Sequence, residues 1–170
     1  MQPDEIYTDG GVISKNPSPI GGTWAWCWVR KGKCVYYKSG VILAHEYRTI
    51  SNNFTELVAA VKAIESVPRD WNGVLYTDSA VTKARMTTGT RFEGVPNELR
   101  LNVLKLRRGR KWTVQLVAGH PTKKHLREGH KNGAPVSKHN VFCDYLCGSR
   151  AREVISERGR LRLTEKRLTR

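Results

Sequence analysis

The sequence predicts an α/β fold built on a mixed five-stranded sheet with helices on both faces. Three strand-like segments come first and are joined by tight turns, which is typical of an antiparallel meander. Two later strand-like segments each lie between helices, an order that favours two parallel strands added to the same sheet. The chain has 170 residues, is 39% hydrophobic and contains five Trp, which suffices for one domain with its own core.

The leading strands are predicted at residues 5–9 and within "GGTWAWCWVRKGKCVYYKSGVILA", residues 21–44, where a turn at 31–33 separates two strands. In the first strand of that pair every second residue is tryptophan: Trp24, Trp26 and Trp28. Strict alternation places the three rings on one face of the sheet. We expect a helix to cover that face, because a nucleic-acid stacking platform would leave three large apolar rings in water.

The later elements follow from their periodicity and punctuation. Residues 52–67 form a clear helix, because five apolar side chains recur at helical spacing: Phe54, Leu57, Val58, Val61 and Ile64. The remaining predictions are a buried strand at 73–77, a short helix at 79–86, a helix at 96–109, a strand at 111–119, a loop at 121–138 and a final helix at 139–155. No internal repeat or linker divides the chain. We expect a catalytic domain at 1–156 and a basic tail at 157–170.

The charge indicates a polyanionic partner. The formal net charge is +15 and the sequence pI is near 10.1, which favours nucleic acid over a small metabolite. The basic side chains are not confined to the tail, because further clusters lie at 107–111 and 123–138. No apolar run is long enough for a membrane span, and the N-terminus lacks a signal pattern. We therefore expect a soluble, cytoplasmic monomer with no obligate protein partner.

Three acidic side chains stand out against this basic background. Asp9 and Asp78 each follow a Tyr-Thr pair at a predicted strand end, and a mixed sheet would place those ends side by side. Glu56 shares a helical stripe with three alanines, which let the helix lie close to the sheet. Taken singly, Asp9 could be a turn residue, Asp78 a helix cap, and Glu56 a capping-box partner of Asn53.

Taken together, the three carboxylates would repel one another unless a cation neutralises them. Hard cations with oxygen ligands, Mg²⁺ or Mn²⁺, match such a set. A basic surface around an acidic metal site suits a nuclease, because the basic side chains bind phosphates and the metal activates water.

Four segments then point to a family. "YTDGG…KNPSPIGG", "TISNNFTELVAAVKAI", "VLYTDSA" and "VAGH…HNVFCDYLC" resemble, in order, the motifs of type 1 ribonuclease H, over about residues 5 to 150. The resemblance implies a ribonuclease H-like fold and endonucleolytic cleavage of the RNA strand of RNA–DNA hybrids, assisted by two Mg²⁺ ions, with Mn²⁺ as a possible substitute. It implies four metal-binding carboxylates: Asp9, Glu56, Asp78 and Asp144.

The resemblance also implies roles around these acids. Asn16 and Asn52 match asparagines that read 2′-hydroxyls of the RNA strand, and Ser51 stands where a DNA phosphate is contacted. The alternative is that the two asparagines serve only a turn and a helix cap. His120 matches the histidine that assists water activation or product departure, although His125 and His130 lie in the same long loop.

The sequence departs from the family at positions that concern binding, because Ala80 stands where many members carry a Gln that touches the hybrid. The segment 86–97 is too short for the basic handle that some members carry. We expect the tail to replace it as a flexible cationic arm, and the alternative is that the tail continues the last helix or adds an edge strand.

Other readings stay open from the sequence. His139, Cys143 and Cys147 lie one helical turn apart and could belong to a zinc site, although three ligands on one helix cannot all reach one tetrahedral ion. A junction resolvase on the same fold and a catalytically silent hybrid-binding module are the functional alternatives. The intact carboxylates favour an enzyme, and Asn16, Ser51 and Asn52 favour a hybrid substrate.

Overall fold

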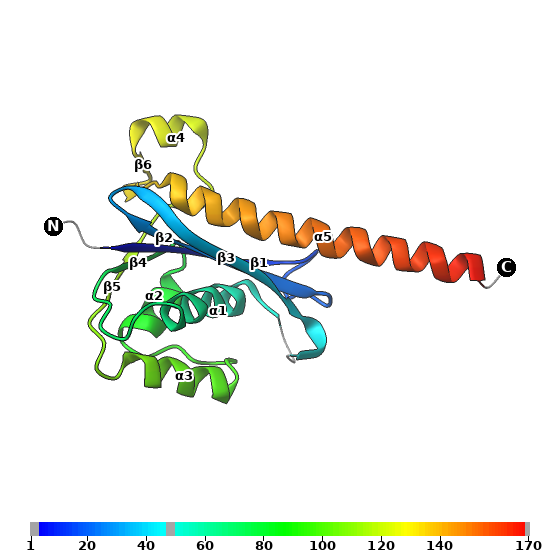
Figure 1. The fold of residues 1–170 in the computed structure, drawn as a ribbon, viewed down its shortest axis with the longest axis horizontal. Helices are drawn as coiled ribbons and strands as arrows, with labels where there is room; N and C mark the ends of the chain where they lie inside the picture. The colour runs from blue at the N-terminus through cyan, green and yellow to red at the C-terminus, as the bar shows by residue number, and fades with distance from the viewer. Residues whose placement is uncertain (1–3, 47–49, 169–170) are drawn as a thin grey trace.

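A computed structural model describes residues 4–46 and 50–168, and within them it has the predicted sheet (Figure 1). Its five strands lie in the order β3-β2-β1-β4-β5. The meander strands β1, β2 and β3 pair antiparallel, whereas β1 with β4 and β4 with β5 pair parallel. The bounds are β1 Glu5–Val12, β2 Gly21–Arg30, β3 Lys33–Leu43, β4 Val74–Thr77 and β5 Thr113–Leu116.

Helices cover both faces of this sheet, as predicted (Figure 1). One face carries α1 (Asn52–Glu65), α2 (Ala80–Thr87) and α3 (Asn97–Arg107), and the other carries the first half of α5 (Lys138–Leu168). A short 3₁₀ helix, Ala44–Glu46, follows β3. The bounds agree with the periodic segments of the sequence to within a few residues, except for α5 and for the segment before it.

The alternation along β2 divides the core between the two faces. Trp24 and Trp26 are buried in the cluster that contains α1, and Trp28 packs at its edge. Ala25 and Cys27, which point the other way, are buried in a second cluster with α5. The prediction that a helix covers the tryptophan face is therefore confirmed, and the rings are core residues rather than a stacking platform.

The prediction of a loop at 121–138 is wrong. This segment contains α4 (Lys123–Glu128) and a small hairpin of β6 (His130–Lys131) and β7 (Ala134–Pro135). Thr122 caps α4 with a capping box, and Gly129 ends it in the left-handed conformation at φ 79°. The helix was missed because it buries no side chain, so its sequence carries no apolar periodicity.

The last helix is also longer than predicted. α5 runs without a break from Lys138 to Leu168, across the boundary expected between domain and tail, and its second half projects beyond the sheet (Figure 1). Residues 157–168 therefore have a helical backbone. This agrees with the alternative that the tail continues the last helix, and not with a flexible coil. No helix in the described part of the chain combines the length and apolar character that a bilayer crossing needs.

Candidate active site

The two Tyr-Thr-Asp segments lie in register on neighbouring parallel strands. Tyr7 of β1 is paired with Tyr76 of β4, so Asp9 and Asp78 each stand two residues beyond a matched pair. The Thr8 hydroxyl donates to the Tyr76 carbonyl at 3.2 Å, which ties the two strands together just before the acids. The repeated motif thus places two carboxylates at one point of the sheet.

The structure contradicts the simple explanations of the two aspartates, a turn role for Asp9 and a helix-cap role for Asp78. Asp9 is not a turn residue, because β1 continues to Val12 and pairs Asp9 with Ala25 of β2. Asp78 follows β4 directly but does not cap α2, since the N-cap is Ser79, whose side chain accepts from the Thr82 backbone N–H. Neither the turn explanation nor the cap explanation therefore accounts for these two aspartates.

Glu56 reaches the same point from α1. Ser51, not Asn53, is the N-cap of this helix, so the capping-box explanation of Glu56 fails. Glu56 is the fifth helical residue and its side chain is buried at 2% exposure. Gly10 permits this approach, because a Cβ at position 10 would lie 2.3 Å from the Glu56 backbone nitrogen. The absence of a side chain on β1 therefore brings α1 against the strand.

The three carboxylates form one compact cluster. Each of Asp9, Glu56 and Asp78 offers an oxygen within 4.8 Å of the others. Burial, with smaller contributions from the charges of Asp78 and Asp144, raises the pKa of Asp9 to about 8. Burial likewise raises the pKa of Glu56 well above its ordinary value, and that of Asp78 in the same direction. The folded protein thus holds these acids close together at a cost that protonation or a cation relieves.

A divalent cation fits this cluster. The donor set consists only of carboxylate oxygens, the type that Mg²⁺ and Mn²⁺ prefer. The Glu56 Oε2 atom is buried and has no hydrogen-bond partner among the described residues, which is costly for a charged oxygen. A metal ion would satisfy this atom and offset the mutual repulsion of the acids. The chain therefore carries a candidate metal site where Asp9 within β1 meets Asp78, which follows β4, and Glu56 of α1.

Asp144 lies at the edge of this cluster rather than within it. It comes from α5 on the other face of the sheet, and its side chain is 49% exposed. It lines one open cleft of about 310 Å³ together with Asp9, Glu56, Asp78 and His120. Its charge contributes to the raised pKa of both aspartates.

His120 stands at the rim of the cleft. Its Nδ1 atom is 3.6 Å from Asp144 Oδ1, and its side chain is 77% exposed. The backbone at His120 is left-handed, with φ 45°. Lys131 holds this segment, because its Nζ donates to the carbonyls of Gly119 at 2.7 Å and His120 at 3.2 Å. No pattern in the sequence indicates this role of Lys131, since it is one of several lysines in a polar segment.

The other two histidines of the segment have different surroundings. His125 belongs to the capping box of α4, where its Nδ1 accepts from the Thr122 backbone N–H at 3.2 Å. His130 lies in β6 and is exposed. Neither lines the cleft that contains the carboxylates, so the geometry favours His120 among the three.

The residues expected to contact substrate gather at the start of α1. Asn16 Oδ1 accepts from the Asn52 backbone N–H at 3.2 Å, so the two side chains are neighbours, and both are exposed. Asn52 also lines the cleft. The Ser51 hydroxyl accepts from the Phe54 backbone N–H at 3.3 Å as the N-cap. All three therefore lie beside the carboxylate cluster, and Asn16 and Ser51 also stabilise the helix N-terminus.

The zinc reading of α5 is not supported. Cys143 and Cys147 are buried, and their thiols donate to the carbonyls of Tyr7 at 3.3 Å and Asp9 at 3.4 Å. His139 packs its ring against Tyr7 with centroids 5.4 Å apart. Among the described residues, the acidic cluster is the group whose ligand atoms lie close enough for a metal. The three residues therefore pack α5 on the sheet.

A mixed sheet that carries Asp9 within β1 and Asp78 directly after the parallel neighbouring strand β4 defines a protein of the ribonuclease H-like fold class. The family model described as RNase H matches residues 2–152, and the chain therefore belongs to the RNase H family. The metal dependence of this family agrees with the acidic cluster.

Curated relatives match over a shorter span. The Ribonuclease H of Pectobacterium atrosepticum is 35% identical over 85 residues, which is 49% of each chain. The Ribonuclease H of Cereibacter sphaeroides (strain ATCC 17029) is 39% identical over 82 residues, covering 48% of this chain and 52% of that protein. The chain thus spans about half the length of the curated relatives that it matches.

Solved structures show the same fold at low identity. RNase H1 from the halophilic archaeon Halobacterium salinarum NRC-1 has a TM-score of 0.63 and 19% identity, covering 88% of this chain and 98% of that one. LC11-RNase H1 in complex with an RNA/DNA hybrid also has a TM-score of 0.63, with 16% identity and coverage of 89% and 99%.

Proposed function

We propose that this chain is a ribonuclease H enzyme that cleaves the RNA strand of RNA–DNA hybrids. The observation that carries the proposal is the cluster of Asp9, Glu56 and Asp78, whose oxygens lie within 4.8 Å of one another in an open cleft. Family membership and the complex of LC11-RNase H1 with an RNA/DNA hybrid support the choice of substrate. The strongly basic chain suits a duplex that carries phosphates on both strands.

We infer that Asp9, Glu56, Asp78 and Asp144 hold two divalent ions, with Mg²⁺ as the working cofactor and Mn²⁺ as a substitute. When bound, such ions supply an activated water and stabilise the leaving oxygen of the phosphodiester. Asp9 and Glu56 contribute buried oxygens from β1 and α1, which fixes their positions, whereas the exposed Asp144 can adjust to the substrate.

The chain's other residues position the substrate and move protons. His120 can carry a proton on its imidazole between the cleft and bulk water, because it is exposed and lies beside Asp144. The amides of Asn16 and Asn52 bind 2′-hydroxyls, which distinguish RNA from DNA. Asn16 Oδ1 is engaged with the Asn52 backbone, so the Asn16 Nδ2 group is the donor of that side chain. The Ser51 hydroxyl accepts from Phe54 and can still donate its own proton to a phosphate.

One assay tests the proposal. A 5′-labelled RNA–DNA hybrid, the matching duplex DNA, duplex RNA and a four-way DNA junction are incubated with Mg²⁺, with Mn²⁺ or with EDTA. We expect cuts within the RNA strand of the hybrid, with either metal and not with EDTA. Equal cutting of duplex DNA or preferential cutting of the junction would make the chain a DNA nuclease instead. Tight hybrid binding without cuts would make it a binding module.

The setting of the enzyme is also a proposal. We expect it to act as a monomer in the cytoplasm, without an obligate protein partner.

A further inference from the structure

Helix α5 connects the cleft with the part of the molecule that projects farthest from the sheet (Figure 1). Its residues Asp144, Gly148 and Ala151 line the cleft. From Ser156 to Leu161 every side chain on it is exposed, and the helical backbone continues to Leu168. We call residues 156–168 the arm. At ~1.5 Å per residue the arm is about 20 Å long.

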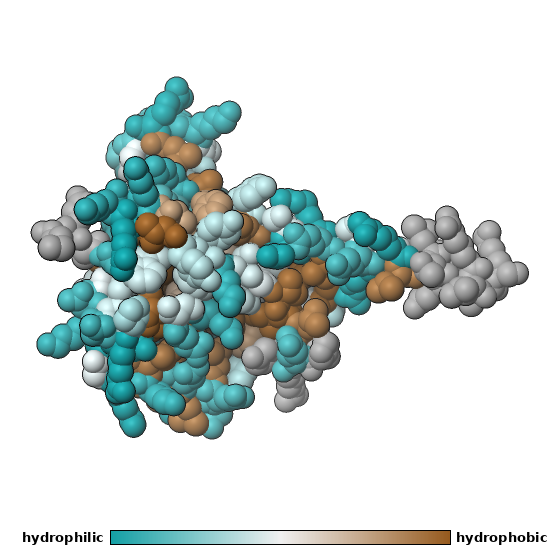
Figure 2. All heavy atoms as spheres, in the orientation of Figure 1, coloured by the Kyte–Doolittle hydropathy of each residue, from teal (hydrophilic) through white to brown (hydrophobic). Residues whose placement is uncertain are grey.

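The arm contains more basic than acidic residues. It holds five basic and two acidic residues: Arg158, Arg160, Arg162, Lys166 and Arg167, with Glu157 and Glu165. In Figure 2 the projecting helix is mostly hydrophilic up to its grey end, whereas a hydrophobic patch lies near its base. A basic helix that begins at the cleft proposed for phosphodiesters is suited to binding a polyanion.

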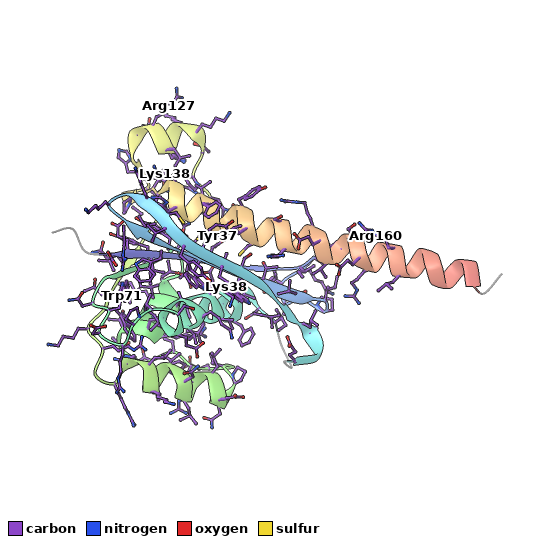
Figure 3. The ribbon with its side chains drawn as sticks, viewed as in Figure 1. Tyr37, Lys38, Trp71, Arg127, Lys138 and Arg160 are labelled. Atoms are coloured by element: carbon purple, nitrogen blue, oxygen red, sulfur yellow. The ribbon has the colours of Figure 1, made fainter. Side chains whose placement is uncertain are left out.

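Helical spacing extends the cleft-lining side of α5 into the arm. The lining positions 144, 148 and 151 are followed, in steps of four, three, four and four residues, by 155, 158, 162 and 166. Residues three or four apart lie on one side of a helix, so these four positions continue the cleft-lining side. By sequence, Arg158, Arg162 and Lys166 are basic and Ile155 is apolar. Arg160 lies on a different side, where it lines a depression with Ser149 and Ser156, and Figure 3 shows it on the projecting half of α5.

The base of the arm lies beside the segment between β1 and β2. Val154, Arg158 and Leu161 line a groove together with Pro19 and Ile20, in the segment between β1 and β2, and with the end of β3. That same segment carries Asn16, which contacts the start of α1 at the cleft. Arg158 therefore lies on the side of the molecule where the asparagines expected to read the RNA strand are placed.

We propose that the arm is a helical phosphate-binding extension of the active site, which contacts the hybrid duplex to one side of the cut with the side of the helix that continues the cleft-lining positions. The proposal rests on the proposed function for the identity of the duplex. At ~3.4 Å per base pair the arm spans about six base pairs, so its contribution requires a duplex that extends that far beyond the cleft. The contacts are to phosphates, so they add affinity and no sequence preference.

A matched pair of variants tests the orientation of the arm. Arg158→Gln with Arg162→Gln removes two charges from the cleft-lining side, and Arg160→Gln with Arg167→Gln removes two from other positions of the same helix. Glutamine keeps helix propensity, and thermal unfolding checks that both proteins fold. Binding is measured on the Asp9→Asn background in EDTA, with hybrids that extend three or ten base pairs beyond a central segment on either side. The KM and turnover are measured on the otherwise unchanged chain.

We expect the first pair to weaken binding of a long hybrid about tenfold at 0.1 M salt and to lower the log–log salt slope by about 1.4 to 1.8. The loss should vanish for hybrids shortened on one side, and should appear in KM rather than in turnover. The control pair should change binding less than threefold. Equal losses in both pairs, no loss in either, or a change of oligomeric state in the first pair would overturn the proposal. If the unchanged chain cuts no hybrid, the proposed function fails, while the binding data still decide the role of the arm.

Discussion

The metal-free protein should become more stable when Asp9 is replaced by Asn, and the gain should grow with pH. The pKa of Asp9 is raised to about 8 from the ordinary value of 3.8, chiefly by burial. The folded state therefore keeps a proton that the unfolded state loses, and stability falls as pH rises from about 4 to about 8. Asparagine keeps the shape of the side chain, never ionises, and can donate to the neighbouring Glu56, which removes this dependence.

The size of the effect follows from linkage. One proton held by the folded state between pH 5 and pH 8 corresponds to about 4 kcal/mol, at ~1.4 kcal/mol per pH unit. The cleft is open, so water and small movements of the acids relieve part of the cost, and we expect about 2 kcal/mol at pH 8. For a chain of this length that is a rise in Tm of about 4–8 °C.

The assay is thermal unfolding followed by circular dichroism in EDTA at pH 5 and pH 8. It compares the unchanged chain, Asp9→Asn and the control Asp70→Asn, because Asp70 is exposed and outside the cluster. The Asp9 variant should gain stability at pH 8 and little at pH 5, and the control should gain at neither. Mg²⁺ should then raise the Tm of the unchanged chain at pH 8 and not that of the variant. The variant should also lose hybrid cleavage.

Two outcomes would refute this reasoning. An equal Tm for the unchanged chain and Asp9→Asn at pH 8 would mean that burial and the neighbouring charges impose no cost on an ionised Asp9 in the folded protein. Cleavage by the variant at near the unchanged rate would mean that Asp9 does not hold the metal. In the second case the metal site would have to be sought elsewhere in the chain.

Three further perturbations have definite expected results. Gly10→Ala should destabilise the fold by about 3 kcal/mol in denaturant unfolding, because the added Cβ would lie 2.3 Å from the Glu56 backbone nitrogen. A smaller loss would mean that α1 can shift away from β1. Ser51→Ala should cost about 1 kcal/mol as a lost N-cap, and an unchanged midpoint would contradict the cap. Lys131→Met should lower turnover on hybrid with little change in KM, since the loss of the Lys131 ammonium frees the backbone of His120. Adding His120→Ala to this variant should cause no further loss of turnover. Additive losses would mean that the two residues act independently.

The four acids illustrate how far sequence reasoning reaches into a site. The repeated Tyr-Thr-Asp motif is visible in the sequence, and parallel pairing of the two segments brings Asp9 and Asp78 together in register. Glu56 was predictable from its stripe of small residues, although the close approach of α1 depends on Gly10 in another element. Asp144 carries no local signal, because one acid on an amphipathic helix does not show where that helix packs, and only the resemblance to a family pointed to it.

The mixed character of the sheet, the tryptophan face and most helices were predictable from the sequence itself, because alternation, helical periodicity and the succession of elements are local features. The exposed elements could not be found in that way. α4 buries nothing, and the arm of α5 has no apolar face along its length, so neither leaves a periodic trace. Their backbones are held by capping, by short-range hydrogen bonds and by continuation of a helix already packed on the sheet.

The tertiary structure alone decided which residues around the cluster face the cleft. It separated His120 from His125 and His130, made Lys131 the support of the histidine segment, and turned His139, Cys143 and Cys147 into packing residues. The physical reason is that a local pattern determines which side of an element is buried, whereas a site is formed by side chains from elements that are distant in sequence. Their distances depend on how closely the backbones can approach, and here Gly10 in β1 permits the close approach of α1.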